Sequence, residues 1–426
     1  MEENSSFRSP CPYFGRCGGC QYMDMPYEEE LKAKEEKVLS LISEPCGQPS
    51  FKDTEGKWVF EGIRKSPLEY GYRNKMEFSF GDEVKGGPLA LGLHRKKSYY
   101  SIVDMDNCLI CPEDMNLIRN CTRDYFGKLY NEGRIDFVSP KDHKGYLRHL
   151  LLRRGMNTKE NLICLDTASA SNSLKLKASE EEEIIQGYVR EILSLEGKLK
   201  GKIAGICHIY NDALSDKVQS DKTEVLYGRD YIYEEICGLK FRISIFSFFQ
   251  TNPLGAEVLY GTAKEYALEA GGGPLKVIYD LYSGTGTISE IMSKAAEEVY
   301  GIEIVEEAVA AARENAKINN ISNVFFLAGD VLKVLEGEEG KELPRPDMII
   351  LDPPREGVNA KALGKILGFG CENIVYISCR PASLARELPA FGWAGYRLIK
   401  ARCIDMFPHT DNVETIVLLS KKNSNF

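Results

Sequence analysis

The hydrophobic pattern divides most of the chain into two long stretches with different periods. Between residues 59 and 245, apolar and polar residues alternate over short segments, which is typical of strands with one solvated face. We expect strands that include residues 72–81, 147–155, 161–166 and 201–212, with a helix over 173–195. This stretch therefore predicts an antiparallel, β-rich domain.

After Gln250, uniformly apolar segments alternate with helical ones. We expect helices over residues 256–270, 287–299 and 306–320, and strands within 276–286, 299–304, 324–330, 347–357 and 373–381. Strands that alternate with helices in this way predict an α/β fold with a parallel, doubly wound sheet.

The N-terminal part begins with cysteines and continues as a charged helix over residues 25–42. Leu31, Val38 and Ile42 mark its apolar side, and we expect its lysines and glutamates to form a solvated face. We divide the chain into a cysteine-rich segment with a helix (1–58), a β-rich central domain (59–245) and an α/β domain (246–426).

The composition is that of an ordinary soluble protein, with 43% hydrophobic and 27% charged residues. There is no apolar run long enough for a membrane span, and the acidic N-terminus does not resemble a signal peptide, so we expect a cytoplasmic protein without a membrane partner. In a reducing compartment its 13 cysteines are available as metal ligands, nucleophiles or packing residues. The net charge of −9 disfavours a globally basic nucleic-acid binder but permits a local basic stripe.

A glycine loop, "DLYSGTG", places Gly284 and Gly286 between a strand and a helix. Residue 289 is a serine where the dinucleotide fingerprint requires a third glycine, so NAD is disfavoured. Asp280 and Glu303 end strands, where a carboxylate can accept ribose hydroxyls, and Asp330 could meet an adenine amino group. Each acid alone could equally be a helix N-cap. Together they favour a nucleoside without phosphate, such as S-adenosylmethionine.

Two further strand ends carry candidate chemistry. Cys379, in "VYISCRP", follows a buried strand at the edge where α/β sheets bind ligands, although a free cysteine is more often a small packing residue. Asp352, in "LDPPREG", follows another strand. Amino-methyltransferases use a similar Asp/Asn-Pro-Pro-aromatic motif, and Arg355 in place of the aromatic residue indicates a different methyl acceptor.

The motifs "FFQTN", "DLYSGTG", "GIEI", "LDPPREG", "YISCRP" and "FPHTDNVETIVLL" together resemble the S-adenosylmethionine-dependent RNA 5-methyluridine methyltransferases. The resemblance extends through "CPYFGRCGGC", "YGYRNKMEFSFG" and "VDMDNC" and so covers nearly the whole chain. It implies a C-terminal Rossmann-like class I methyltransferase domain, a central RNA-binding domain and an N-terminal iron–sulfur segment.

The resemblance also implies roles for single residues. Carbon 5 of uracil is a weak nucleophile, so a thiolate must first add to carbon 6, and a base must later remove the proton on carbon 5. Cys379 would be the nucleophile, with Arg380 lowering its pKa, and Glu414 the base; without the resemblance Glu414 would be an ordinary surface acid. Thr287 and Asn412 stand where many members have Asn and His. The residues expected to contact the cofactor or the target base are Gln250, Tyr282, Gly284, Thr287, Glu303, Asp330 and Asp352.

Cys11, Cys17 and Cys20 form a C-x5-C-x2-C array, which favours a soft metal. Chemistry alone would make zinc the commoner occupant. The resemblance instead implies a [4Fe–4S] cluster with Cys108 as the fourth ligand, for which Cys111 and Cys121 are possible substitutes.

Residues 141–155 contain five Lys or Arg against one Asp, and the central domain adds Arg64, Lys65, Arg73, Lys75, Arg95, Lys96 and Lys97, so we expect phosphate contacts there. The target uridine must be unstacked, in transfer or ribosomal RNA. Family members usually carry a β-barrel (TRAM) domain before the cysteines, but only ten residues precede Cys11, so we expect that domain to be missing and the protein to act as a monomer. The alternatives are an RNA cytosine-C5 methyltransferase and a non-catalytic RNA-binding factor.

Overall fold

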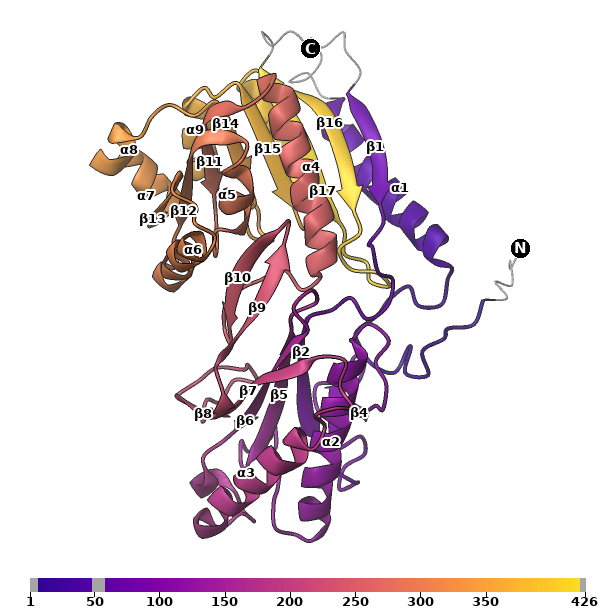
Figure 1. Cartoon of the computed structure of the whole chain (residues 1–426). Helices are drawn as coiled ribbons and strands as arrows, with labels where there is room; N and C mark the ends of the chain where they lie inside the picture. Colours follow the sequence, from indigo (N-terminus) through magenta and orange to yellow (C-terminus); the bar gives the residue numbers. More distant parts are fainter. Residues whose placement is uncertain (1–6, 48–57, 422–426) are drawn as a thin grey trace.

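The computed structural model describes residues 7–47 and 58–421 and arranges them around two large β-sheets, one above the other in Figure 1. None of the helices in these ranges is both long and apolar enough to cross a membrane. The upper sheet belongs mainly to the second half of the chain and the lower sheet to the first half.

The upper sheet has eight strands in the order β1-β16-β17-β15-β14-β11-β12-β13. We expected a parallel sheet, and β11 to β15 do pair in parallel, but β17 runs antiparallel to both β15 and β16. A short loop without a crossover helix joins β16 to β17, which makes the pair antiparallel. The strands are β1 (Val59–Arg64), β11 (Leu275–Leu281), β12 (Ala296–Glu303), β13 (Val324–Ala328), β14 (Met348–Leu351), β15 (Asn373–Ser378), β16 (Tyr396–Ile404) and β17 (Glu414–Lys421).

Helices cover both faces of the upper sheet, as the doubly wound pattern predicts. One face packs on α4 (Pro253–Gly271), α5 (Thr287–Met292) and α6 (Glu306–Ile318). The other packs on α1 (Tyr27–Cys46), α7 (Val331–Glu336), α9 (Ala360–Gly368) and α10 (Pro381–Trp393), with the short α8 (Glu338–Glu342) beside α7. The helix expected over 287–299 is shorter, because β12 already begins at Ala296.

Two N-terminal elements differ from the sequence prediction. The strand Val59–Arg64, which we expected to open the central domain, pairs in parallel with β16 at the edge of the upper sheet. The charged helix α1 packs against α10, and Glu30 and Lys34 are fully buried rather than solvated. Lys34 forms ion pairs with Glu30 (2.6 Å) and Asp405 (2.8 Å), which explains how these charges tolerate burial.

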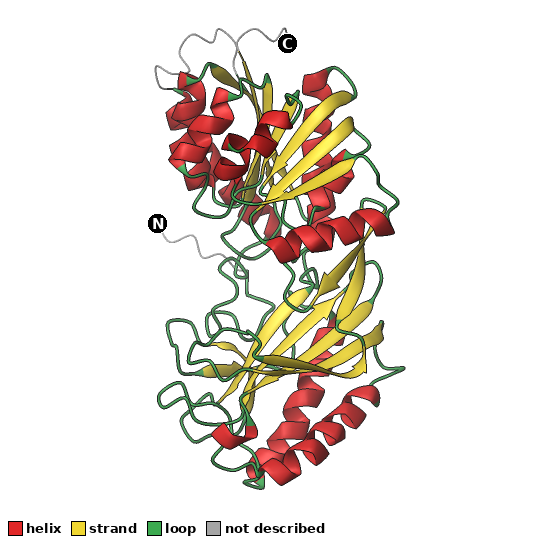
Figure 2. Cartoon of the chain, turned by 90° about the vertical axis from the view of Figure 1, so that its left-hand side faces the viewer, coloured by secondary structure: helices red, strands yellow, loops and turns green. Residues whose placement is uncertain are grey.

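The lower sheet has seven strands in the order β4-β3-β2-β5-β6-β7-β8. It is not purely antiparallel, because the crossover helix α3 makes β6 and β7 parallel neighbours. Helices α2 (Glu113–Asn131) and α3 (Ala178–Leu193) cover one face, as Figure 2 shows. The strands are β2 (Lys75–Gly81), β3 (Ala90–His94), β4 (Ile102–Asp104), β5 (Leu147–Arg154), β6 (Glu160–Thr167), β7 (Lys202–Tyr210) and β8 (Lys222–Gly228).

A hairpin of β9 (Tyr231–Ile236) and β10 (Leu239–Ser244) connects the two sheets. Its apolar side chains share one core with α4 above and with Leu151 and Cys164 of the lower sheet below. The segment that follows β10, residues 245–252, enters the upper half and contains the "FFQTN" motif.

Candidate functional site

A cleft of about 1390 Å³ opens where β11, β12, β14 and β15 end. In α/β sheets this edge is the usual place for ligands. The cleft brings together all the residues expected for cofactor binding and catalysis: Gln250, Tyr282, Gly284, Thr287, Glu303, Asp330, Asp352, Cys379 and Glu414.

The glycine loop forms one wall of the cleft. Gly284 has a φ of +54° and a Cβ there would meet no atom within 4 Å, so its backbone faces open space that a ligand can approach. Gly286 has a φ of +80°, and a Cβ there would lie 2.6 Å from the Phe326 ring. Tyr282 adopts a φ of 69°, which is rare for a residue with a side chain and typical of strained functional sites.

The carboxylates of Glu303 and Asp330, at the ends of two strands, accept hydrogen bonds from different backbone N–H groups. The Glu303 carboxylate accepts hydrogen bonds from the Gly284 N–H (3.0 Å) and the Val305 N–H (2.9 Å), which fixes it at the rim of the cleft. Asp330 caps α7 by accepting the Lys333 N–H (3.1 Å), so the N-cap alternative holds for this residue, which also lines the cleft.

Asp280 lies beneath the cleft rather than in its lining. Its side chain is fully buried, and Oδ2 accepts a hydrogen bond from Ser289 Oγ (2.5 Å), while Oδ1 has no partner among the described residues. Burial raises its pKa to about 6. The serine that disfavoured a dinucleotide site therefore supports this carboxylate.

Asp352 and Glu414 approach each other on the floor of the cleft. Burial raises the pKa of Asp352 to about 7, with a smaller contribution from the negative charge of Asp280. Burial, followed by the charge of Asp352, raises the pKa of Glu414 to about 8. Such pKa values near neutrality are typical of groups that exchange protons during catalysis.

Cys379 is half-buried beside these two acids. Burial and the charges of Glu414 and Asp352 raise the pKa of its thiol to about 11, and Arg355 opposes the rise. The sequence had suggested Arg380 as the activating cation, but this side chain is exposed and Arg355 supplies the positive charge. Arg380, which immediately precedes α10, does not line the cleft.

Several lining residues were not expected to contribute. Arg73 reaches the cleft from the lower half of the molecule, and the exposed rings of Phe246 and Phe248 form its lip. The Tyr260 hydroxyl of α4 is hydrogen-bonded to the Gln250 side chain. The sequence gives no sign that Tyr260, a tyrosine within a helix, lines a cleft. Phe246 and Phe248 could have been noticed, because they stand among polar residues just before α4.

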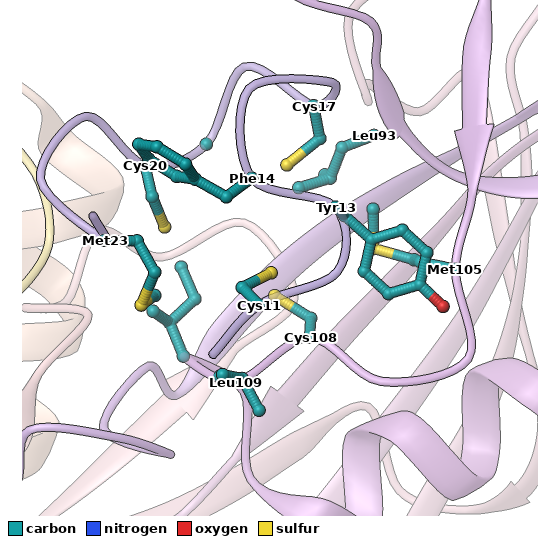
Figure 3. Close-up of a pocket in the computed structure, with 12 residues that line it drawn as sticks. Cys11, Tyr13, Phe14, Cys17, Cys20, Met23, Leu93, Met105, Cys108 and Leu109 are labelled. Carbon is teal, nitrogen blue, oxygen red and sulfur yellow. The ribbon is translucent and has the colours of Figure 1, made fainter. Parts of the chain in front are cut away.

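The four cysteines of the predicted metal site line one pocket, shown in Figure 3. Their sulfur atoms point into a shared space whose remaining lining is apolar and includes Tyr13, Phe14, Met23 and Leu93. All four are free thiols. They lie close enough to interact electrostatically, since the charges of Cys108, Cys17 and Cys11 add to the effect of burial in raising the pKa of Cys20 to about 12.

The two alternative ligands lie elsewhere. Cys111 is buried outside the pocket and its thiol is hydrogen-bonded to Cys108, while Cys121 donates to the Glu191 carbonyl oxygen (3.7 Å). Within residues 7–47 and 58–421, no three His, Cys, Asp or Glu side chains are close enough together to hold a single metal ion.

The basic segment 141–155 is less available to phosphate than its composition predicts. Arg148, Arg153 and Arg154 are buried. Arg148 donates to three carbonyl oxygens of the 211–215 loop, Arg153 to two of the 245–247 segment, and Arg154 pairs with Asp114 (3.1 Å). These arginines are structural, because Arg148 and Arg153 satisfy backbone carbonyl groups and Arg154 neutralises a buried carboxylate.

Known proteins that are similar in sequence to this chain are RNA methyltransferases. Residues 217–422 match the family described as tRNA (Uracil-5-)-methyltransferase. An uncharacterized RNA methyltransferase of Caldanaerobacter subterraneus is 45% identical over 421 residues, covering 98% of this chain and 86% of that protein. Another, from Clostridium acetobutylicum, is 46% identical over 414 residues, covering 97% and 84%.

Among solved structures, the crystal structure of Pyrococcus abyssi tRNA (uracil-54, C5)-methyltransferase in complex with S-adenosyl-L-homocysteine matches with a TM-score of 0.70 and 24% identity. The match covers 95% of this chain and 86% of that one. The two proteins therefore share a fold over nearly their whole length.

Proposed function

Because this chain belongs to the tRNA (uracil-5-)-methyltransferase family and is an S-adenosylmethionine-dependent RNA uracil-C5 methyltransferase, we propose that it methylates uridine through a covalent bond between Cys379 and carbon 6 of the base. The observation that carries this proposal is the meeting of Cys379, Asp352 and Glu414 in one cleft.

The cleft suits an adenosine-containing cofactor. The Glu303 carboxylate, held by two backbone N–H groups, can accept ribose hydroxyls, and Gly284 permits close approach of the ligand. The Tyr282 ring and the apolar side chains of Ile304 and Val331 provide surface for the adenine. When bound, S-adenosylmethionine supplies an electrophilic methyl group and a positive sulfonium.

Cys379 acts first in the proposed reaction. Its thiol passes its proton to the Asp352 carboxylate, the sulfur bonds to carbon 6 of uracil, and the ring electrons move toward carbon 5, which takes the methyl group from the cofactor and leaves S-adenosylhomocysteine. The thiol is weakly acidic while Asp352 and Glu414 carry charge. Asp352 has a pKa near neutrality, so it can hold the proton of the thiol, and its neutral form removes part of the repulsion that opposes thiolate formation while Glu414 stays a carboxylate.

Glu414 completes the reaction. Its carboxylate takes the proton from carbon 5, the carbon–sulfur bond breaks, and Cys379 leaves as a thiolate, so that 5-methyluridine is released. A carboxylate with a pKa of about 8 is a stronger base than an ordinary glutamate. Its burial at the start of β17 therefore suits this role.

We further propose that Cys11, Cys17, Cys20 and Cys108 hold a [4Fe–4S] cluster. Four thiolates around one zinc ion, each about 2.3 Å from the metal, must come within about 4 Å of one another. A cluster binds each thiolate at a different iron and so suits thiols spread around a wider pocket. The pocket is otherwise apolar, and the buried Arg119 lies near Cys108, where its positive charge can offset that of the thiolates.

The experiment uses anaerobically purified protein, methyl-labelled S-adenosylmethionine, and transfer and ribosomal RNA from a host that lacks 5-methyluridine. We expect label in 5-methyluridine after digestion to nucleosides, and none with Cys379→Ala. Cys121→Ala, which changes a thiol far from the cleft, should retain the activity. Label in 5-methylcytidine would instead identify a cytosine enzyme, and the absence of label would refute the catalytic proposal.

A further inference from the structure

A second hollow lies on the lower sheet, away from the catalytic cleft. It is lined by side chains that include Ser79, His94, Tyr99, Tyr100, Arg148 and Asp216, and we call it the His94 pocket. We propose that a nucleobase of the substrate RNA other than the target uridine stacks on the exposed rings at the mouth of the His94 pocket. This inference rests on the proposed function, since it concerns how the same RNA is held.

Exposed aromatic rings form the mouth of the pocket. Tyr99 is 56% and Tyr100 66% exposed, which is unusual for two adjacent large side chains. The His94 ring stacks on Tyr99 with centroids 5.9 Å apart and an interplanar angle of 21°, and Tyr100 meets Tyr99 edge-on at 5.6 Å. Exposed ring faces of this kind are the surfaces on which proteins stack unpaired bases.

Polar groups behind these rings can read the edge of a base. The Asp216 carboxylate lies between His94 Nε2 (3.4 Å) and His149 Nε2 (3.2 Å), and His149 Nδ1 is 3.2 Å from Ser79 Oγ. His94 Nδ1 is buried and has no hydrogen-bond partner among the described residues. The Asp216 carboxylate is partly exposed, so it offers a hydrogen-bond acceptor to the edge of a stacked base.

The Asp216 loop is held in place before any ligand binds. Arg148 donates to the carbonyl oxygens of Asn211 (3.1 Å), Ala213 (2.7 Å) and Ser215 (2.6 Å). A buried arginine that satisfies three carbonyl groups restricts the loop to one conformation. Binding a base there costs less ordering entropy than it would on a free loop.

The charge around the pocket suits a nucleic acid. The loops that carry the tyrosines and His143 also carry Lys96, Lys97, Lys141 and Lys144, which are exposed. The first three form no ion pair with any residue in the described part of the chain, and Lys144 Nζ only donates to Asn172. Asp216 in the pocket faces two histidines, and among the other acids nearby Glu83 pairs with Arg16 and Arg95, and Asp142 is flanked by lysines.

The pocket and the wall of the catalytic cleft lie near opposite ends of β5, whose own side chains are buried. The register pairs Ser79 with His149 and Lys75 with Arg153, so these four residues lie on the face opposite α2 and α3. Arg153 in turn binds the carbonyl oxygens of Ile245 (3.0 Å) and Ser247 (2.5 Å) at the wall of the cleft. The two sites are thus separated by about four residues of strand, roughly 13 Å, which a few nucleotides can span.

The first test is a Tyr99→Ala/Tyr100→Ala variant, with Trp393→Ala as its control because Trp393 is 76% exposed on α10, far from both sites. We expect the KM for RNA to rise at least about fivefold in the tyrosine variant, as for the loss of a stacked base. The kcat and the KM for S-adenosylmethionine should not change. An unchanged KM for RNA would overturn the proposal.

The second test separates stacking from charge through the salt dependence of RNA binding. Lys96→Ala/Lys97→Ala should weaken binding and reduce the slope of log Kd against log salt by about 2. The tyrosine variant should weaken binding with an unchanged slope. A tyrosine variant whose slope falls with the loss of affinity would show that the rings only organise the lysines, and would contradict a base pocket.

A Tyr99→Trp variant in a Trp393→Phe background keeps the stacking surface and adds a reporter. We expect RNA to quench its fluorescence, and an unquenched indole at saturating RNA would count against the proposal. These results are independent of the proposed chemistry. If the proposed function is wrong, the wild-type protein forms no Cys379 adduct, whereas if only the His94 pocket is wrong, wild-type methylation is intact.

Discussion

At the scale of single residues, the cleft holds acidic groups whose negative charges repel one another and are poorly solvated. Cys379, Asp352 and Glu414 are crowded into a poorly solvated corner with Arg355 as the nearby positive charge. Burial raises the pKa of all three groups, the charge of Asp352 adds to the rise for Glu414 and Cys379, and the charge of Glu414 adds to the rise for Cys379. Such a cluster does not serve folding, so we attribute it to the reaction.

Glu414→Gln should therefore change how stability depends on pH. The folded-state pKa of Glu414 is raised to about 8 from 4.5, so the folded protein binds more protons than the unfolded chain between these values. Stability from this group is fully present below pH 4.5 and is lost as the pH rises through 8. Because glutamine is never charged, we expect the variant to lose less stability between pH 5 and 9.

Thermal unfolding at several pH values measures this effect. We expect the Tm of Glu414→Gln, relative to that of the wild type, to rise by several °C between pH 5 and pH 9. Glu372→Gln, which changes an exposed glutamate, should follow the wild type throughout. Other buried acids, such as Glu290, are present in both proteins and cancel. A Tm gap that does not grow with pH would be inconsistent with a buried, raised pKa.

The sequence shows which strand-end residues line the cleft, but it does not show which charged groups lie beside them. Glu303 and Cys379 were found because a strand pattern places them at the ligand edge. The pairing of Cys379 with Arg355 rather than Arg380 depends on where α10 begins. Likewise, a run of arginines looks the same whether it faces phosphate or, like Arg153, buried carbonyl groups.

At the scale of elements, the cysteine segment is joined to the loop that leads to Glu414. The Gln21 and Tyr22 N–H groups both donate to the His409 carbonyl oxygen (2.8 and 3.1 Å), and the His409 N–H donates to Glu30 of α1 (2.7 Å). Phe407 packs in the same small core as Met23 and Cys20, and His409 has a φ of 67°. The loop 405–413 is thus shaped by contacts from the N-terminal part.

Loss of the proposed iron–sulfur cluster should loosen this loop. In anaerobically purified Cys17→Ser/Cys20→Ser protein we expect loss of bound iron and faster amide hydrogen exchange in residues 407–413. Residues 360–368 of α9 should exchange at the wild-type rate, since they lie on the outer face of the upper sheet. Cys121→Ser should leave both iron content and exchange unchanged. Loss of iron without faster exchange in 407–413 would disprove the coupling.

Helices and strands could be predicted from the sequence where the apolar period was regular, but the elements against which they pack could not. The strands and helices after residue 253 lie close to their expected positions, with α5 ending early because its connection to β12 is short. The placement of β1 and α1 on the upper sheet depends on contacts with β16 and α10, some 340 residues later in the chain. Such long-range pairing leaves no local signal.

At the scale of the whole molecule, the two sheets carry different sites. The upper sheet holds the cleft, and β5 of the lower sheet runs from the His94 pocket to the cleft wall at Arg153. A net charge of −9 leaves RNA to be held by local features, namely exposed lysines and aromatic rings. The fold class and the cleft followed from the sequence, whereas the His94 pocket combines residues from loops that no periodic pattern connects.

The most direct test of the central claim is to trap the covalent intermediate with RNA that carries 5-fluorouridine. Fluorine on carbon 5 cannot be removed as a proton, so Glu414 cannot complete the reaction after methyl transfer. We predict a denaturation-resistant protein–RNA complex that forms only with S-adenosylmethionine and whose modified peptide, by mass spectrometry, is attached at Cys379. Formation of no such complex, or of one attached at another residue in a protein that still makes 5-methyluridine, would contradict the account.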